Sequence, residues 1–539
     1  MVLTLLVLGL TLWIVFKVVK RYALHPTILA GPPSASAMVG NLGQIFSADG
    51  LGYHDEFLKK YGRVFQVHGL LGEKQIFTSD CAAISAILND PDMFPHTEEY
   101  NSIGRLILGP GMIGAQGQQH KRLRKMLNPI FSTSNIRELT GAFFGIAHKL
   151  RDRLEQQLSP SSSSEVNILD WLSRAALDLI GIGGVGYHFG AVDGEENEYM
   201  KAAKDLLPTL TSVGSITLLI PHLPPSISFR RKILKFLPWP ALKKFLGIIE
   251  TMDRTAWEVY KGKKRQVIEK EVVEEKEGRG KDVMSLAIAA NECAAADTRL
   301  TDVELVAQMG DLIFAGQDTT SGALCRTLQA LSTKPELQHR LRKEIVEAKQ
   351  AKRGEDLDYE TLQSLPVLGA VCQEVLRLYP PVTWFDRIAH SDTSFPLASP
   401  ITTLSGKTLS SIPVLKGTTV IMSVHGVNRD KAIWGDDADE FRVERWEEKE
   451  REERRAKVPS VWGSLRVFQS GPMACIGFRY AVLELKVVLS VLIESFEFAA
   501  TGDDIEWTLS FTMSPRVRGK NVPGMPLFVR RAVTGKIEE

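Results

Sequence analysis

The strongest constraint on this chain is a helix pattern near its middle. Thr301-Asp-Val-Glu304 has the form of a capping box, in which the two end residues satisfy N–H groups at a helix start. An apolar-rich run continues from there to about Leu331. A helix of that length is about 45 Å long at 1.5 Å per residue, which is enough to cross a domain. We therefore expect a predominantly helical body with one very long helix.

Further patterns divide the rest of the chain into helices and a few short strands. Helical patterns dominate from about 115 to 385, and residues 478–494 are apolar on nearly all sides, as in a buried helix. The other helices expected are 51–61 and one that starts at 333–336; short strands are expected at 64–68, at 75–78 and within 382–425. The predicted fold class is mainly α with a small β portion.

Composition excludes several classes of protein. The chain has 539 residues, is 44% hydrophobic and 24% charged, and carries a formal net charge of +1. That balance gives no support to nucleic-acid binding. The five cysteines are far apart and form no Cys-x-x-Cys pair, so neither a zinc site nor a disulfide framework is expected. The sequence also lacks an N-glycosylation acceptor, and both observations favour a reducing, cytosol-facing compartment.

The amino terminus predicts a membrane anchor. Residues 2–16 carry no charge, and Lys17, Lys20 and Arg21 follow them. A cleaved signal peptide would place basic residues before the apolar run, so we favour an uncleaved single span over residues 1–22 with the body on the cytosolic side. Prolines at 26, 32 and 33 predict a stiff hinge over residues 23–36. The remaining residues, 37–539, form the predicted catalytic domain.

One cysteine occupies a tight loop near the carboxyl end. Residues 468–477 read FQSGPMACIG, and Cys475 stands just before the buried helix. Backbone N–H groups and the positive end of a helix favour a thiolate there. A thiolate is a soft, electron-donating ligand for haem iron. A buried structural cysteine is the usual interpretation of a lone cysteine, so the loop needs support from other motifs.

Two other patterns lie upstream of this loop. The long helix contains Ala315-Gly-Gln-Asp-Thr-Thr320, and a glycine inside a helix costs about 1 kcal/mol against alanine, which suggests a local opening. An acid and a hydroxyl beside such an opening are suited to relaying protons. Glu374 and Arg377 are i and i+3 on a predicted helix and share one face. Each pattern alone also fits a solvated helix face or an ordinary surface pair.

Together, and in this order, these residues resemble the cytochrome P450 family over nearly the whole chain. The loop at Cys475 is similar to the haem-binding signature of the family, and the glycine-containing stretch is similar to its oxygen-activation motif. The resemblance implies Cys475 as the axial ligand of the iron of haem b and Asp318 and Thr319 as catalytic residues. The other haem-binding residues that it implies are Phe468, Gly471, Gly477, His120, Arg124 and Arg387. The structural triad that it implies is Glu374, Arg377 and Arg445.

Two positions depart from the family pattern. Met473 stands where the loop usually has an arginine, which puts one contact to a haem propionate in doubt. We expect the three remaining donors to neutralise both propionates while Met473 packs against the haem edge. Val443 stands where the motif around Arg445 usually has proline, and this should change only the stiffness of a loop.

The resemblance also implies a reaction and its partners. A haem-thiolate monooxygenase inserts one oxygen atom from O2 into a lipophilic small molecule, with electrons from NADPH. The implied partner is NADPH–cytochrome P450 reductase, with cytochrome b5 as an additional candidate. The implied location is the endoplasmic reticulum membrane. The sequence is similar to fungal members that serve secondary metabolism, which makes a terpenoid the first guess and an aromatic or fatty substrate the second.

Several alternatives stay open at this point. The nearest is a haem-thiolate isomerase or dehydratase that needs no O2; a haem sensor and a non-haem scaffold are more distant. The expected walls of the substrate pocket are 100–113, 205–225, the surroundings of Phe314 and Phe511, and 382–386. The apolar segment 215–225 fits a bilayer contact and a core loop equally well.

Overall fold

The computed structural model describes residues 29–159, 163–195, 198–214, 220–270, 282–296, 298–446 and 458–532. The helices that precede the longest one are α2 (Leu42–Ile45), α3 (Gly50–Tyr61), α4 (Cys81–Asn89), α5 (Glu98–Leu108), α6 (Gly117–Leu127), α7 (Thr133–Glu138), α8 (Thr140–Gln157), α9 (Ile168–Leu179), α10 (Glu198–Ser212), α11 (Ile227–Lys235), α12 (Pro240–Lys270) and α13 (Val283–Glu292). The later ones are α14 (Asp302–Ser332), α15 (Pro335–Ala351), α16 (Tyr359–Ser364), α17 (Pro366–Leu378), α18 (Val424–Asn428), α19 (Lys431–Trp434) and α21 (Phe478–Ser495). The fold is mainly helical, as predicted.

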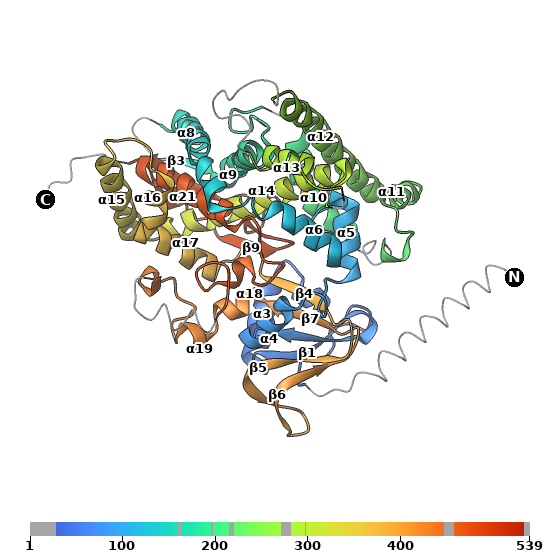
Figure 1. Ribbon diagram of the computed structural model, residues 1–539. Helices are drawn as coiled ribbons and strands as arrows, with labels where there is room; N and C mark the ends of the chain where they lie inside the picture. Colours follow the sequence, from blue (N-terminus) through green and yellow to red (C-terminus); the bar gives the residue numbers. More distant parts are fainter. Residues whose placement is uncertain are drawn as a thin grey trace.

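The long helix α14 begins with the predicted capping box. The Thr301 hydroxyl accepts from the N–H of Glu304, and the Glu304 carboxylate accepts from the N–H of Thr301. The helix crosses the helical part of the molecule, where it packs against α9, α12, α17 and α21 (Figure 1). The sequence therefore located both the start and the length of this helix correctly.

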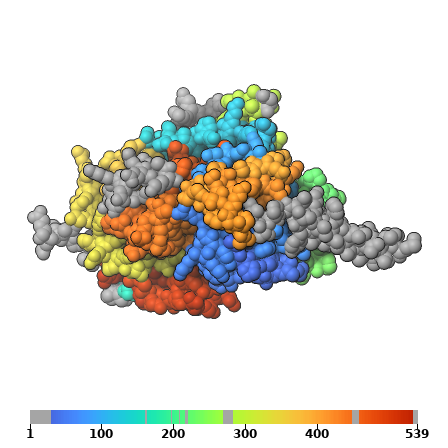
Figure 2. Space-filling view, turned by 90° about the horizontal axis from the view of Figure 1, so that it is seen from below, coloured from blue at the N-terminus to red at the C-terminus, as the bar shows by residue number. Residues whose placement is uncertain are grey.

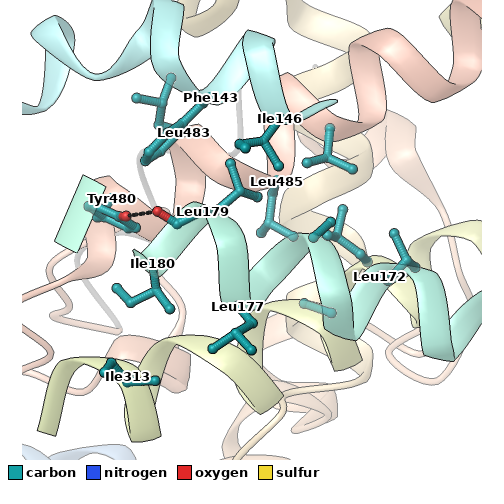
Figure 3. Close-up of a cluster of buried hydrophobic side chains, with 14 of the residues drawn as sticks. Phe143, Ile146, Leu172, Leu177, Leu179, Ile180, Ile313, Tyr480, Leu483 and Leu485 are labelled. Carbon is teal, nitrogen blue, oxygen red and sulfur yellow. Dashed lines mark hydrogen bonds between the residues drawn. The ribbon is translucent and has the colours of Figure 1, made fainter. Parts of the chain in front are cut away.

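The interior between these helices is a continuous apolar core. Leu172 and Leu177 of α9 lie between α8, which carries Phe143, and α14, which carries Ile313 (Figure 3). Helix α21 is buried along most of its length, because α8, α15 and α17 cover both its polar and its apolar side chains. The predicted buried helix at 478–494 is confirmed.

The largest sheet and one hairpin lie together at one end of the molecule, beneath the helices (Figure 1). One sheet has the order β1 (Val64–His68), β2 (Lys74–Thr78), β7 (Thr419–Ser423) and β4 (Trp384–Ile388); only β2 and β7 run parallel. A hairpin of β5 (Thr393–Thr402) and β6 (Thr408–Val414) lies beside it. Viewed from below, residues between about 30 and 100 (blue) and those near 400 (orange) lie side by side, although they are far apart in sequence (Figure 2).

Two smaller sheets come mainly from the carboxyl end. Strand β11 (Pro526–Arg531) lies between β3 (Ser164–Asn167) and β8 (Phe496–Ala500). Strands β9 (Ile505–Leu509) and β10 (Met513–Val517) form a hairpin. The strands expected at 64–68, 75–78 and within 382–425 are all present.

The predicted membrane segments lie partly outside the described residues. The anchor at 1–22 and the first half of the hinge are outside them. Among the helices that the structure does describe, none has the length and apolar character needed to span a membrane. Residues 29–36 of the hinge form no helix or strand, and they pack on the body: Leu29 is buried, and the N–H of Gln66 donates to the Ala30 carbonyl at 2.9 Å. In the segment 215–225, Ile220 is buried against the core.

A buried carboxylate connects α17 with the segment before the cysteine loop. Glu374 is fully buried and accepts hydrogen bonds from Arg377 at 2.8 and 2.9 Å, from Arg445 at 3.3 Å and from the Trp446 indole at 2.9 Å. The N–H of Arg442 adds a further bond at 2.9 Å. The predicted structural triad is therefore assembled in the core rather than on the surface.

We predict that Glu374→Ala destabilises the fold severely. The substitution leaves the buried Arg377 without a carboxylate and leaves Arg445 with Asp437 as its one acidic partner among the described residues. Breaking a buried ion pair in this way typically costs about 3–5 kcal/mol. The measurement is the free energy of unfolding in urea. The matched control is Glu444→Ala, which removes a half-exposed pair with Arg340 and should cost about 1 kcal/mol or less. Equal losses in the two variants would contradict this account of the triad.

Candidate active site

A cavity of about 270 Å³ lies between α14 and the loop that carries Cys475. Its walls come from the residues before and within α5, from α6, from α14, from the cysteine loop and from α21. The predicted site residues that line it are His120, Arg124, Thr319, Phe468, Cys475 and Gly477. Segments more than 300 residues apart in the sequence therefore meet at one space, and most of its surface is apolar.

The cysteine loop holds its sulfur toward this space. The N–H of Cys475 donates to the Phe468 carbonyl at 2.9 Å, and Gly471 adopts a left-handed φ of +73°. A side chain at Gly471 would meet the Leu88 carbonyl of α4 at 2.4 Å, so this glycine allows the loop to pack closely on α4. Gly477 precedes the first residue of α21. Gly471 thus shapes the loop from outside the cavity.

The Cys475 thiol is accessible and yet surrounded by protein. It forms no disulfide, and its side chain is accessible from the cavity. Burial raises the pKa of the Cys475 thiol above its ordinary value, while the N–H of Gly477 and the Arg124 charge act in the opposite direction. Burial of the thiol thus outweighs the groups that favour the thiolate. A bound metal ion would itself deprotonate the thiol.

The face of α14 above the cysteine carries small and hydroxyl side chains. Ala315, Gly316 and Thr319 line the cavity, and the Thr319 hydroxyl donates to the Ala315 carbonyl at 2.6 Å. The predicted local opening is wrong, because α14 is continuous through this stretch. The glycine instead allows close packing, since a Cβ at Gly316 would lie 2.9 Å from the side chain of Ile180.

Asp318 lies on another face of the same helix. Its side chain borders a separate cavity of about 570 Å³, where Lys204 also lies, and it does not line the space beside Cys475. Burial raises the pKa of Asp318 to about 6, and the Lys204 charge opposes this shift. Successive residues of a helix point about 100° apart, which explains why Asp318 and Thr319 face different spaces.

One end of the Cys475 cavity is polar. Arg124 donates to the Pro472 carbonyl at 3.2 Å and also to the Ala474 carbonyl, so α6 is attached to the cysteine loop. Burial and the neighbouring arginines lower the pKa of His120 to about 4. His120 is therefore a neutral hydrogen-bonding group, and Arg124 carries the positive charge.

Arg387 is connected to the polar end of the cavity by two residues, His96 and Gln469, that the sequence analysis did not identify. It is almost fully buried and does not line the cavity itself. Its guanidinium donates to His96 Nδ1 at 3.0 Å and lies 3.5 Å from the Gln469 side-chain oxygen, and both of these residues line the cavity. Burial lowers the pKa of His96 well below its ordinary value, and the Arg387 charge adds to this effect. Since Arg387 donates to Nδ1, the proton of neutral His96 resides on Nε2.

Two buried acids also line the cavity, and no sequence motif predicted either of them. Asp311 accepts from the N–H of Ile113 at 3.1 Å, and burial raises the pKa of Asp311 to about 7. Glu484 of α21 accepts from the Thr320 hydroxyl at 3.1 Å, and burial raises the pKa of Glu484 well above its ordinary value. One joins α14 to the loop after α5, and the other joins α14 to α21.

The expected pocket walls are present only in part. Tyr100, Met112 and Ile113 line the cavity, as does Met473. The helix residues around Phe314 also line it, namely Asp311, Leu312, Ala315 and Gly316, although Phe314 itself does not. The described residues of 205–225, the turn 382–386 and Phe511 do not line it. The rings of Phe314 and Phe511 lie 5.7 Å apart, and Phe314 borders a small separate space beside α10 and α12.

Comparison with known proteins agrees with this geometry. The family model for cytochrome P450 matches residues 30–517. Cytochrome P450 monooxygenase 91 of Postia placenta is 38% identical over 96% of this chain and 97% of its own length. Cytochrome P450 monooxygenase 212 of the same fungus is 37% identical, covering 93% and 92% of the two chains. The ganoderic acid synthetase CYP5150L8 of Ganoderma lucidum is 34% identical over 93% of both.

The chain belongs to the cytochrome P450 family and is a monooxygenase of the fungal type. Membership implies a haem cofactor. The residues at the cavity fit such a group, because a thiol open to the space, a mainly apolar lining and a cationic end match an iron centre, a flat apolar ring and its carboxylates.

We predict that Asp318→Asn changes how stability depends on pH. The pKa of Asp318 rises from 3.8 to about 6 on folding, so the folded protein holds this proton more tightly than the unfolded chain. The free energy of unfolding of the natural protein should therefore fall, relative to the variant, as pH rises from about 4 to 6. Urea unfolding at several pH values measures this difference. If the difference in unfolding free energy between the two proteins does not change with pH, the raised pKa of Asp318 is contradicted.

Proposed function

We propose that this protein is a haem-thiolate monooxygenase whose iron is bound by Cys475. The observation that carries the proposal is the position of Cys475: its sulfur faces a mainly apolar cavity, opposite the Thr319 face of α14. When bound there, haem would activate O2, and the thiolate would favour cleavage of the O–O bond. The chain itself supplies the ligand, the shape of the pocket and the movement of protons.

Thr319 and Asp318 have different parts in proton delivery in this proposal. Thr319 is the hydroxyl on the cavity wall and holds a proton near the place where O2 reacts. Asp318 stands beside the larger cavity on its own side of α14, next to Lys204. With its pKa raised to about 6, Asp318 can give up and regain a proton near neutral pH. It is thus a proton source one residue away from the hydroxyl.

The haem carboxylates would lie at the polar end of the cavity. Arg124 and Arg387 supply the positive charge there, and His120 contributes as a neutral group. His96 and Gln469, which Arg387 contacts, extend the set of donors and acceptors. Met473 lines the same cavity and adds no charge, in keeping with apolar packing against the ring.

The substrate is proposed to be a lipophilic small molecule in a fungal secondary-metabolic pathway, with a terpenoid as the first choice. The apolar lining of the cavity supports a lipophilic substrate. Aromatic or fatty compounds are the second choice. Electrons would come from NADPH through a cytochrome P450 reductase, with cytochrome b5 as an additional donor.

We further propose that residues 1–22 anchor the enzyme in the endoplasmic reticulum membrane, with the catalytic body in the cytosol. The apolar run and the basic residues after it support this orientation. Around α11, Phe236 is 87% exposed and Phe229 is 47% exposed, and Lys232 and Lys235 lie beside them. Exposed aromatic and basic side chains suit a lipid surface.

The experiment is turnover by purified enzyme with reductase, NADPH, O2 and a panel of terpenoid, aromatic and fatty compounds. We expect O2-dependent NADPH oxidation coupled to a hydroxylated product. Product formed without NADPH and O2 would instead support an isomerase or dehydratase, and haem binding without turnover would support a sensor.

We predict that Thr319→Ala keeps substrate binding but uncouples the reaction. Without the hydroxyl, proton delivery to bound O2 is misdirected, so a larger share of NADPH should yield hydrogen peroxide. The ratio of product to NADPH consumed is the measurement. Ser332→Ala, which changes a hydroxyl at the far end of the same helix, is the control. Full coupling in Thr319→Ala would rule out this role.

A further inference from the structure

A second cavity lies where α14 meets α3, the turn after α17, α18 and the β9–β10 hairpin. It encloses about 180 Å³ and shares no lining residue with the cavity at Cys475. It is smaller than the cavity at Cys475, which measures about 270 Å³. Its lining combines arginine, histidine and threonine side chains with the carboxylate of Asp55 and with aromatic rings.

Arg326 of α14 is the central cation of this space. Its guanidinium carbon lies 3.8 Å from the ring centre of Trp507 and 4.3 Å from that of Tyr379, so the group is held between two aromatic rings. Nη1 donates to the Gln329 side chain at 3.0 Å, whereas Nε is buried and has no partner in the described part of the chain. No ion pair joins Arg326 to a carboxylate among those residues. Burial lowers the pKa of Arg326 to about 9, which leaves it charged at neutral pH.

Three more residues of the lining each carry a polar atom without a partner among the described residues. These atoms are Arg429 Nε, Thr383 Oγ1 and His425 Nδ1, and each is buried. Asp55 also lines the cavity and interacts electrostatically with Arg429, but its carboxylate accepts from His425 Nε2 at 2.7 Å and makes no ion pair with either arginine in the described part of the chain. Arg429 makes its ion pair with the exposed Asp439 at 3.2 Å, which is not part of the wall.

We propose that this cavity binds one small anion between Arg326 and Arg429. Buried polar groups are costly unless they are hydrogen-bonded, and a buried charge is costly unless an opposite charge compensates it. A chloride ion, a phosphate ion or a small carboxylate would accept from the two guanidinium groups and from the Thr383 hydroxyl. Such an anion connects α14 with the turn after α17 and with α18, and so it stabilises the junction of the helical and β parts.

The test is the thermal unfolding of the full-length haem protein in detergent at constant ionic strength. Sodium gluconate provides the background, and sodium chloride, phosphate or acetate replaces it stepwise. We expect a saturable rise in the unfolding temperature with at least one of the three ions, because an anion that binds only the folded state stabilises it by mass action. The ion that saturates at the lowest concentration identifies the chemistry of the site.

Variants locate the site. Arg326→Gln should weaken the apparent affinity for that ion by about tenfold or more, since it removes a charge-assisted hydrogen bond. Thr383→Val removes only a hydroxyl and should also weaken the affinity, which keeps the test valid if Arg326→Gln folds poorly. Arg518→Gln, an exposed arginine just beyond β10, should leave the affinity unchanged. No saturable effect with any ion, or an equal effect in all three variants, would overturn the proposal.

Discussion

A buried carboxylate on α17, Glu374, is connected to the cysteine loop by a chain of hydrogen bonds. Glu374 fixes Arg377, and Arg377 in turn donates to the backbone carbonyl of Asn428 at 2.8 Å. The side chain of Asn428 accepts from the N–H of Arg466 at 3.4 Å, two residues before Phe468. A continuous hydrogen-bonded path thus runs from α17 to the start of the loop that presents Cys475. Because every member is buried, none can exchange its partner for water without a large cost.

The long helix α14 provides the opposite wall and separates several functions along its faces. Thr319 faces the Cys475 cavity, Asp318 faces the larger cavity near Lys204, and Thr320 contacts Glu484 of α21. Close packing of Ile180 on Gly316 sets the position of the helix beside the Cys475 cavity. A rigid helix can therefore hold a hydroxyl at the reacting space while keeping the neighbouring acid outside it.

Sequence patterns predicted the parts of this structure that arise from local chemistry. The capping box at Thr301, the apolar helix after the cysteine loop and the pairing of Glu374 with Arg377 all follow from residue spacing, and all are present. The contributions of His96, Gln469, Asp311 and Glu484 could not be predicted in this way. Each acts through a partner that is distant in sequence, and each lacks a spacing rule; His96 meets Arg387 across 291 residues. The prediction of a helix opening at Gly316 was wrong for the same reason, because the close contact with Ile180 is a tertiary feature.

The central claim is that Cys475 is the axial ligand of a haem in this cavity. The most direct measurement is the absorption spectrum of the purified protein after reduction and exposure to carbon monoxide, compared with that of Cys475→Ala. The account predicts the red-shifted Soret band of a thiolate-ligated haem in the natural protein and its loss in the variant. A spectrum typical of histidine ligation in the natural protein, or an unchanged thiolate band in Cys475→Ala, would contradict the account.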